Sequence, residues 1–416
     1  MWRFFIIFER NTAKSGIIEY MDYNIAMKKL QICKTSAAAL LVSLLAVSCQ
    51  HDKAVPAETL SGLNPENFVS VYQGDSTALF VLKNGKGAEV CITNFGGRVV
   101  SLMVPDREGN MRDVVLGFDS VQAYYPENNL TDFGSAIGRY ANRINQGRFM
   151  IEGDTAVLPQ NDFGHCLHGG GEMGSLGWQY RVYNAEQPND STLVLTIESE
   201  DGDNGFPGKV NAKVTYILRD DYALDIAYEA VTDKPTVVNM TNHSYFNLSG
   251  NPEESVEKMW LTVNADGFTP VDSTFMTSGE ILLVEKTPFD FRISKEVGRD
   301  INDTEYEQIQ FGRGYDHNFV LNTGGNIDEA VAELYSPESG ILLSVYTTEP
   351  GVQVYSGNFL DGTMRGKRGK KLKHRTGLCL ETQHYPDSPN KPHWPTTRLN
   401  PGETYSSRTI YKFDTK

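Results

Sequence analysis

The sequence is poor in cysteine, in long apolar runs and in positive charge. Of its 5 cysteines, only Cys91, Cys166 and Cys379 follow position 50, and an odd number of widely spaced cysteines argues against a disulfide framework. The apolar run at residues 37–47 is shorter than the roughly 20 residues that a membrane-spanning helix needs. The formal net charge is −15, and no stripe of lysine and arginine with interleaved aromatic residues occurs. The charge pattern therefore argues against a nucleic-acid partner.

The composition that remains is typical of a globular protein rich in strands. The 416 residues are 40% hydrophobic and 22% charged, which is enough apolar material for a sizeable core. The chain has 38 glycines, 20 tyrosines and 20 phenylalanines, and long amphipathic helical patterns are hard to find. From about residue 67 onward, short alternating runs are separated by turn residues. We therefore expect strands and turns to dominate, within a single domain over residues 67–416.

The N-terminal 49 residues have the features of a secretory signal. Lys28 and Lys29 precede the apolar run 37–47 and then Cys49, and Met27 is a plausible start that would make residues 1–26 an upstream extension. The segment 45–49 resembles a bacterial lipobox, in which the cysteine is lipidated. We expect an exported lipoprotein, in the periplasm or on the cell surface, whose only membrane contact is a lipid anchor at Cys49. An ordinary cleaved signal is the alternative, and residues 50–66 read as a tether.

Two pairs of alternating runs predict β-hairpins. The first pair lies at 209–218 and 224–230 around a turn at 219–221, and the second lies at 331–335 and 341–346 around 337–340. In each run every second residue is apolar, so one face is buried. Repeated hairpins with few helices predict an all-β fold in which antiparallel sheets pack as a large sandwich.

Two titratable residues stand out by their surroundings. His243 lies among amide, hydroxyl and aromatic groups just after the β-branched run 236–240, so it is either a proton donor at the end of a strand or a structural histidine. Glu381 lies in an otherwise apolar strand, where a carboxylate is costly unless it is solvated, paired or used. A catalytic base and an internal ion pair are both compatible with Glu381.

Other polar residues cluster at the ends of strand-like runs. An amide and a guanidinium at Asn142 and Arg143 could bind hydroxyl oxygens or form a surface ion pair. Asp316 precedes an apolar strand, and Gln353 and Asn358 follow another. Trp178, which follows the glycines at 169–171, could offer a flat apolar face to a sugar ring.

His165 and His168 are spaced so that both could ligate a metal ion. Such a site needs a third ligand, which His243 or Glu381 would have to supply. No second close pair of ligands occurs in the sequence, so we favour a hydrogen bond from His168 to a ligand and expect no metal.

Seven ordered motifs resemble the aldose 1-epimerase family, also called galactose mutarotases. The resemblance covers the chain from about residue 67 to the end and implies a galactose mutarotase-like antiparallel β-sandwich. It implies an isomerase of hexose metabolism that interconverts the α- and β-anomers of free aldohexoses such as glucose and galactose, without a cofactor. The motifs are Asn-Arg-Ile at 142–144, Leu-His-Gly-Gly at 167–170, Asn-His-Ser-Tyr-Phe-Asn-Leu at 242–248, Asp-His-Asn-Phe at 316–319, Pro-Gly-Val-Gln at 350–353, Gly-Asn-Phe at 357–359 and Glu-Thr-Gln at 381–383.

The resemblance also implies roles for individual residues. His243 matches the general acid and Glu381 the general base of ring opening, and we expect each charge to favour the charged form of the other. The groups that match those holding the sugar hydroxyls are Asn142, Arg143, His168, Asp316 and Gln353. Two alternatives remain: a glycoside hydrolase that uses Asp316 and Glu381 as paired carboxylates, and a sugar-binding lipoprotein without catalysis.

Overall fold

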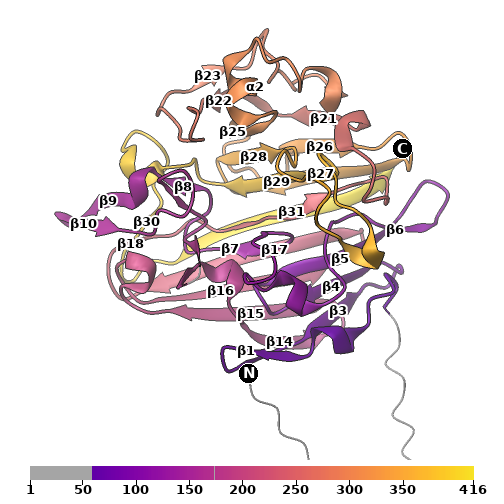
Figure 1. The fold of residues 1–416 in the computed structure, drawn as a ribbon, viewed down its shortest axis with the longest axis horizontal. Coiled ribbons are helices and arrows are strands. Elements are labelled where there is room, and N and C mark those ends of the chain that lie inside the picture. Colours follow the sequence, from indigo (N-terminus) through magenta and orange to yellow (C-terminus); the bar gives the residue numbers. More distant parts are fainter. Residues whose placement is uncertain (1–58, 173) are drawn as a thin grey trace, which may run out of the picture. The chain divides into compact units, whose positions relative to one another are not determined.

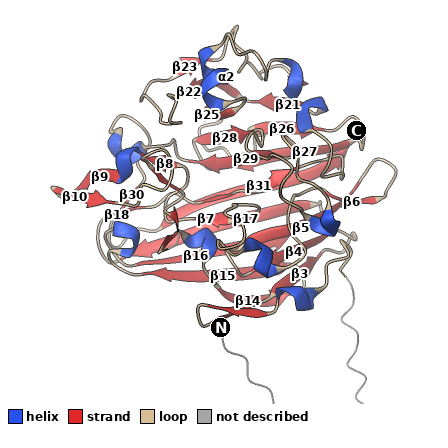
Figure 2. Cartoon of the chain, viewed as in Figure 1, coloured by secondary structure: helices blue, strands red, loops and turns tan. Residues whose placement is uncertain are grey.

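The computed structural model describes residues 59–172 and 174–416, which fold mainly into antiparallel strands (Figure 1). Strands far outnumber the short helical turns (Figure 2). The predicted signal, Cys49 and most of the predicted tether lie outside the described residues. Within the described residues, no helix is long and apolar enough to cross a membrane.

Two large sheets carry most of the chain. In the nine-stranded sheet the order is β14 (Asn184–Asn189), β15 (Thr192–Ser199), β16 (Val210–Leu218), β17 (Ala223–Thr232), β31 (Tyr405–Thr415), β27 (Ile341–Thr347), β26 (Ala332–Tyr335), β21 (Trp260–Val263) and β24 (Lys295–Glu296). In the six-stranded sheet the order is β20 (Tyr245–Phe246), β29 (Leu378–Gln383), β28 (Gly351–Tyr355), β25 (Asp316–Leu321), β22 (Ala265–Thr269) and β23 (Leu282–Leu283).

Smaller sheets and helical turns complete the fold. A four-stranded sheet contains β3 (Leu79–Lys83), β4 (Glu89–Thr93), β5 (Arg98–Pro105) and β6 (Met111–Asp113). The two-stranded pairs are β1 (Ser70–Tyr72) with β2 (Asp75–Thr77), β7 (Ala136–Ile137) with β19 (Thr241–Asn242), β8 (Arg143–Ile144) with β11 (Cys166–Leu167), β9 (Arg148–Ile151) with β10 (Asp154–Val157), β12 (Gly171–Glu172) with β13 (Ser175–Leu176), and β18 (Thr236–Val237) with β30 (Arg398–Leu399). Helix α2 spans Glu307–Gly312, and 3-10 turns span Pro65–Phe68, Val121–Tyr124, Asn145–Gly147, Trp178–Tyr180, Asp203–Gly205, Val256–Lys258, Val297–Arg299, Lys367–Gly369 and Ser388–Asn390.

Both predicted hairpins are present. β16 pairs with β17 and β26 pairs with β27, each antiparallel. Along β16 the predicted face, which carries Val210, Ala212, Val214, Tyr216 and Leu218, is buried, and it belongs to the main hydrophobic core. The same core contains side chains of β4, β27 and β29, so the sheets pack face to face over one apolar layer. The predicted β-sandwich is therefore confirmed.

Two boundaries differ from the sequence-based prediction. The folded part begins before residue 67, because Leu63 is buried against Phe68 in a second hydrophobic cluster. The predicted strand 236–240 is divided, because β18 pairs with β30 whereas β19 pairs with β7. Between them, the amide of Val238 donates to Thr397 and that of Asn239 donates to Arg139, so the chain changes pairing partners shortly before His243.

Candidate active site

Three adjacent strands of the six-stranded sheet form one wall of a polar cavity. Gln353 of β28 lies directly opposite Glu381 of β29 in the antiparallel register, so both side chains project from the same face. Asp316 begins β25, on the other side of β28. The opposite face of β29 carries Leu378 and Leu380 into the main core. One face of β29 therefore anchors the strand, and the other face presents the carboxylate.

Gln353 fixes the carboxylate of Asp316. Its Nε2 donates to Asp316 Oδ1 over 2.6 Å, while its Oε1 is buried without a partner among the described residues. Burial raises the pKa of Asp316, and the nearby Arg143 guanidinium opposes that rise. Gln353 Oε1 is therefore an acceptor that a ligand hydroxyl can satisfy.

His243 reaches the cavity from the turn between β19 and β20. Its backbone N–H donates to Ser135 O over 2.9 Å, and its carbonyl accepts from Gly134 N over 2.9 Å. The imidazole stacks on the ring of Tyr245, with ring centroids 5.1 Å apart and planes 16° apart. Backbone pairing and ring stacking together fix the direction in which the imidazole points.

The imidazole of His243 lies beside the carboxylate of Glu381. Nε2 of His243 is 3.6 Å from Oε1 of Glu381, and the two side chains are 7% and 2% exposed. His243 Nδ1 and Glu381 Oε2 are both buried without a hydrogen-bond partner among the described residues. The structure thus brings together the two titratable residues that the sequence singled out.

Burial, however, favours the neutral forms of both groups. It lowers the pKa of His243 to about 3. Burial also raises the pKa of Glu381 well above its ordinary value, and the carboxylates of Asp316 and Asp132 add to that rise. The expectation that each charge would favour the charged form of the other is therefore not met, because the cost of removing two charges from water outweighs their attraction at this separation. A neutral imidazole beside a protonated carboxyl has the same total number of protons as the ion pair. The two states differ only in whether one proton lies on His243 or on Glu381.

Asn142 and His168 hold each other in place at another wall. The N–H of Asn142 donates to His168 Nδ1 over 3.1 Å, and the N–H of His168 donates to the carbonyl of Asn142 over 3.0 Å. Burial lowers the pKa of His168 well below its ordinary value, and a proton on His243 or the charge of Arg143 acts in the same direction. With Nδ1 accepting, the proton of the neutral ring lies on Nε2, so His168 is a hydrogen-bond donor.

Arg143 lies next to Asn142 at the start of β8, which pairs with β11. Its Nη2 is 2.7 Å from Asp162 Oδ2, and its Nε donates to the same oxygen over 2.8 Å. Its guanidinium carbon lies 5.0 Å from the centroid of the Phe275 ring. Asp162 therefore orients the guanidinium and leaves Nη1 as a further donor.

All seven predicted site residues line one cavity of about 280 Å³. They come from six separate parts of the chain, and the predicted substrate-binding groups surround the His243 and Glu381 pair. The residues that line the cavity besides the predicted seven include Thr131, Asp132, Phe133, Asp162, Leu167, Tyr245, Tyr355, Leu360 and Met364.

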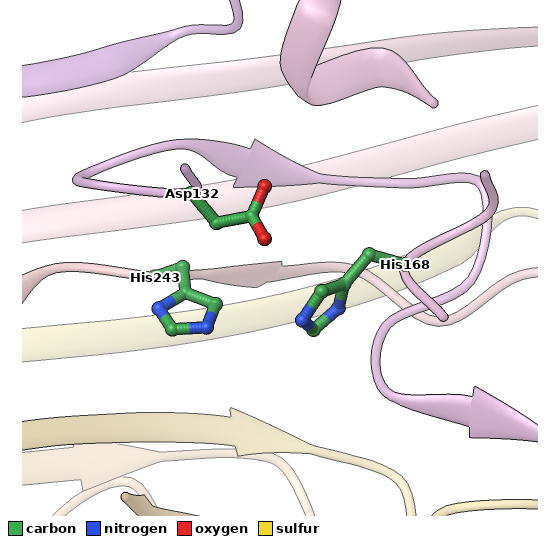
Figure 3. A group of neighbouring side chains, drawn as sticks. All are labelled: Asp132, His168 and His243. Atoms are coloured by element: carbon green, nitrogen blue, oxygen red, sulfur yellow. The ribbon is translucent and has the colours of Figure 1, made fainter. Parts of the chain in front are cut away.

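Asp132 is the main polar residue of the cavity that the sequence did not reveal. Figure 3 shows its carboxylate directed toward the rings of His168 and His243, and the nearest nitrogen and oxygen atoms of the three residues lie within 4.8 Å of one another. Burial raises the pKa of Asp132 to about 6, against the attraction of the Arg98 guanidinium. Its segment, residues 126–132, has neither the alternation of a strand nor a recognisable cluster of charged residues. The sequence therefore gave no reason to single out Asp132.

Among the residues that the structure describes, two groups of side chains have the chemistry to hold a cation. The first contains Asp132, His168 and His243, and the second contains His243, Cys379 and Glu381. The His165 and His168 pair that the sequence suggested does not act together, because His165 accepts from Gln146 N through Nδ1 and contacts Thr274 Oγ1 through Nε2. The nitrogen and oxygen atoms of the two groups can also form hydrogen bonds with the hydroxyls of a sugar.

The sequence-based suggestion that Trp178 offers its face to a sugar ring is wrong, and Asn358 is likewise unavailable to a ligand. Trp178 is 1% exposed and belongs to the main core, where it packs so tightly on Gly138 that a Cβ there would lie 2.0 Å from its ring. Asn358 is used within the fold, because its Nδ2 donates to the carbonyls of Gly312 and Tyr315. Neither side chain is available to a ligand.

Comparisons with known proteins agree with this geometry. Residues 78–412 match the family model described as aldose 1-epimerase. The chain is 39% identical to galactose mutarotase of Bos taurus over 325 residues, which cover 78% of this chain and 90% of that protein. It is 38% identical to aldose 1-epimerase of Escherichia coli K12 over 344 residues, which cover 82% of this chain and 96% of that protein.

Solved structures show the same fold. An aldose epimerase homologue from C. elegans superposes with a TM-score of 0.74 at 30% identity, covering 82% of this chain and 99% of that one. Galactose 1-epimerase from Lactobacillus acidophilus superposes with a TM-score of 0.72 at 28% identity, covering 83% and 97%. The ordered motifs, the sandwich and these matches agree, and the chain belongs to the aldose 1-epimerase family.

Proposed function

We propose that this protein interconverts the α- and β-anomers of free aldohexoses, with glucose and galactose as substrates. One observation carries the proposal: an imidazole and a carboxylate lie 3.6 Å apart in a cavity lined by uncharged and charged groups suited to hydroxyls. An acid and a base at adjacent positions are what opening a hemiacetal ring requires. The names of the two relatives, galactose mutarotase and aldose 1-epimerase, support this substrate class.

Ring opening uses each member of the pair once. Glu381 takes the proton from the anomeric hydroxyl while His243 donates a proton to the ring oxygen. The bond between C1 and the ring oxygen breaks, its electron pair stays with that oxygen, and C1 becomes an aldehyde carbon. Rotation about the C1–C2 bond presents the other carbonyl face, and reversal of both proton transfers closes the ring as the opposite anomer.

The protonation states favoured by burial match one point of this cycle. When the sugar is open, Glu381 holds the proton it has taken and His243 is neutral, which is the combination that burial favours. Opening of the closed sugar instead requires ionised Glu381 and protonated His243. That state is reached when one proton moves from Glu381 to His243.

Asp132 has a supporting role in this proposal. Its carboxylate is near His243, so a negative charge there favours the imidazolium that the closed sugar requires. Its Oδ1 is buried without a partner among the described residues, so it can also accept a hydrogen bond from a sugar hydroxyl.

The remaining groups hold the sugar. The donors are His168 Nε2, Arg143 and the amide of Asn142, and the acceptors are Asp316 and Gln353 Oε1. Four carboxylates, those of Asp132, Asp162, Asp316 and Glu381, line the cavity with Arg143. Because the guanidinium of Arg143 is already paired with Asp162, the cavity favours neutral sugars over sugar phosphates and sugar acids.

The test is polarimetry on freshly dissolved α-glucose and α-galactose with a protein comprising residues 50–416. We expect optical rotation to reach equilibrium faster with protein than without it. Release of reducing ends from glycosides without anomer conversion would instead support a glycoside hydrolase, and tight sugar binding without conversion would support a binding protein.

We also propose that the protein is an exported lipoprotein anchored at Cys49. The basic pair at residues 28–29, the apolar run 37–47 and the lipobox-like segment 45–49 support this proposal. Labelling with radioactive palmitate in cells should mark the wild type and not the Cys49→Ala variant. Equal labelling of both proteins would contradict the proposed anchor.

A further inference from the structure

Two half-exposed phenylalanines stand at the mouth of the cavity. Phe163 is 53% exposed and Phe359 is 46% exposed, and both line the cavity. Each packs against the buried Phe275, with ring centroids 5.5 and 5.7 Å apart. Phe275 thereby links the two exposed rings into one aromatic surface, which we call the aromatic rim.

Phe163 occupies a turn that is unfavourable for its residue type. The turn spans Asp162–His165 and is closed by two backbone hydrogen bonds, Asp162 N to His165 O at 3.2 Å and His165 N to Asp162 O at 2.7 Å. Phe163 has φ 46° and Gly164 has φ 84°, so both central residues are left-handed, as in a type I′ turn. Asparagine, aspartate and glycine are preferred at such positions, whereas a bulky aromatic residue is disfavoured.

That choice of residue points to a ligand. An exposed phenylalanine in a left-handed turn loses stability both from its backbone and from leaving apolar surface in water. Its packing on Phe275 covers only part of the ring, since half of the side chain remains exposed. A ligand that covers the remaining face would recover the apolar burial.

Phe359 is held more firmly on the other side of Phe275. Its backbone N–H donates to the hydroxyl of Tyr355 over 3.2 Å. The guanidinium carbon of Arg313 lies 5.0 Å from the centroid of the Phe359 ring. The side chain of the preceding residue, Asn358, donates to the carbonyls of Gly312 and Tyr315. These hydrogen bonds fix the backbone next to Phe359.

The size of the cavity limits what it can enclose. Its volume of about 280 Å³, which includes the part lined by Phe163 and Phe359, is just below the roughly 300–1,000 Å³ typical of small-molecule sites. The catalytic pair requires only a free anomeric hydroxyl, which the reducing end of an oligosaccharide also carries. With the reducing-end ring inside, a second ring has to lie at the mouth.

We propose that Phe163 and Phe359 form an outer subsite for the second ring of a reducing disaccharide or longer saccharide. This inference rests on the proposed anomer conversion, whose chemistry it leaves unchanged. Pyranose rings carry apolar C–H faces that pack on aromatic rings, and the aromatic rim offers two such surfaces. The subsite makes reducing oligosaccharide ends preferred substrates over the monosaccharide.

The experiment compares kcat/KM for glucose, maltose and cellobiose by polarimetry with the full-length protein. The variants are Phe163→Asn, Phe359→Leu and, as a matched control, Trp260→Ala, since Trp260 is an exposed aromatic residue, 38% exposed, away from the cavity. For each disaccharide we take the ratio of its kcat/KM to that of glucose. In each phenylalanine variant we expect this ratio to fall about 3- to 10-fold for at least one disaccharide, which is the effect expected from the loss of one aromatic contact. The control should keep the wild-type ratio.

Phe163→Asn separates binding from folding. Asparagine suits the type I′ turn, so its thermal unfolding midpoint should equal or exceed that of the wild type. Retained folding with an unchanged ratio for both disaccharides, in both phenylalanine variants, would overturn the outer subsite. Absence of glucose conversion in the wild type would instead overturn the proposed function itself.

Discussion

Asn142 and His168 exchange two hydrogen bonds, backbone N–H to Nδ1 at 3.1 Å and backbone N–H to carbonyl at 3.0 Å, so the position and the tautomer of the imidazole are set together. Both residues have positive φ, 59° and 52°, which is uncommon for residues other than glycine. The strained pair at the edge of the cavity is typical of a functional site.

His168→Ala should raise KM without a comparable fall in kcat. The variant removes the Nε2–H donor to the sugar, and a lost hydrogen bond is worth about 0.5–1.5 kcal/mol, or about 2- to 12-fold in KM. The matched control is His165→Ala, because His165 contacts Gln146 and Thr274 and does not line the cavity. Steady-state kinetics in which both variants behave alike would remove His168 from sugar binding.

Asp132→Asn should increase stability above pH 6 and have little effect near pH 4. Burial raises the pKa of Asp132 to about 6, above the value near 3.9 of an unfolded chain. The folded protein therefore binds this proton more strongly, and it loses stability as the pH rises between those values. Removing the charge should recover up to about 3 kcal/mol at pH 8. Urea unfolding at both pH values checks this, and an equal effect at pH 4 and pH 8 would contradict the raised pKa.

The same substitution should change the pH dependence of catalysis. If the Asp132 carboxylate favours protonated His243, kcat/KM of the wild type should decline as the pH falls through about 6. Asp132→Asn should lack that inflection and should have a lower kcat/KM at pH 8. A variant that is more stable yet as active as the wild type at pH 8 would show that Asp132 does not assist the reaction.

The imidazole of His243 should remain neutral in the sugar-free protein at pH 6. Burial lowers its pKa to about 3, so protonation should begin only well below the ordinary value near 6.5. Nitrogen-15 NMR of labelled histidine measures this directly, with the His243→Asn variant used to assign the signal. A His243 signal that titrates near pH 6.5 would show that the site sustains the imidazolium despite its burial.

The alternating pattern made the sandwich predictable, whereas the assembly of the cavity came from the resemblance. The alternating burial along β16 and the turn at 337–340 could be predicted from local sequence alone. His243 and Glu381 could each be recognised as unusual in their own segment, but their proximity depends on pairing between distant strands. Asp132 and Phe163 gave no local signal, because one lies in an irregular segment and the other is an ordinary aromatic residue until its turn is seen.

The protonation states of His243 and Glu381 could not be predicted from the sequence. Charge attraction between a histidine and a glutamate can be anticipated from their identities, but the loss of hydration depends on how completely the fold covers them. Glu381 is 2% exposed and Cys379, two residues earlier on the same face of β29, is also buried. The three-dimensional burial therefore reverses the charge states expected from the pair alone.

His243 and Glu381 act together as acid and base in this proposal, and anomer conversion by Glu381→Gln, His243→Asn and the double variant tests that pairing. Polarimetric kcat/KM on α-glucose should fall about 10²- to 10⁴-fold in each single variant. The double variant should fall little further, since the two groups serve one step. Near-ultraviolet circular dichroism should match the wild type in all three proteins. A folded single variant that keeps more than about a tenth of wild-type kcat/KM would contradict the account, since its lost group would then supply less than the roughly 10²-fold expected of a proton-transfer partner.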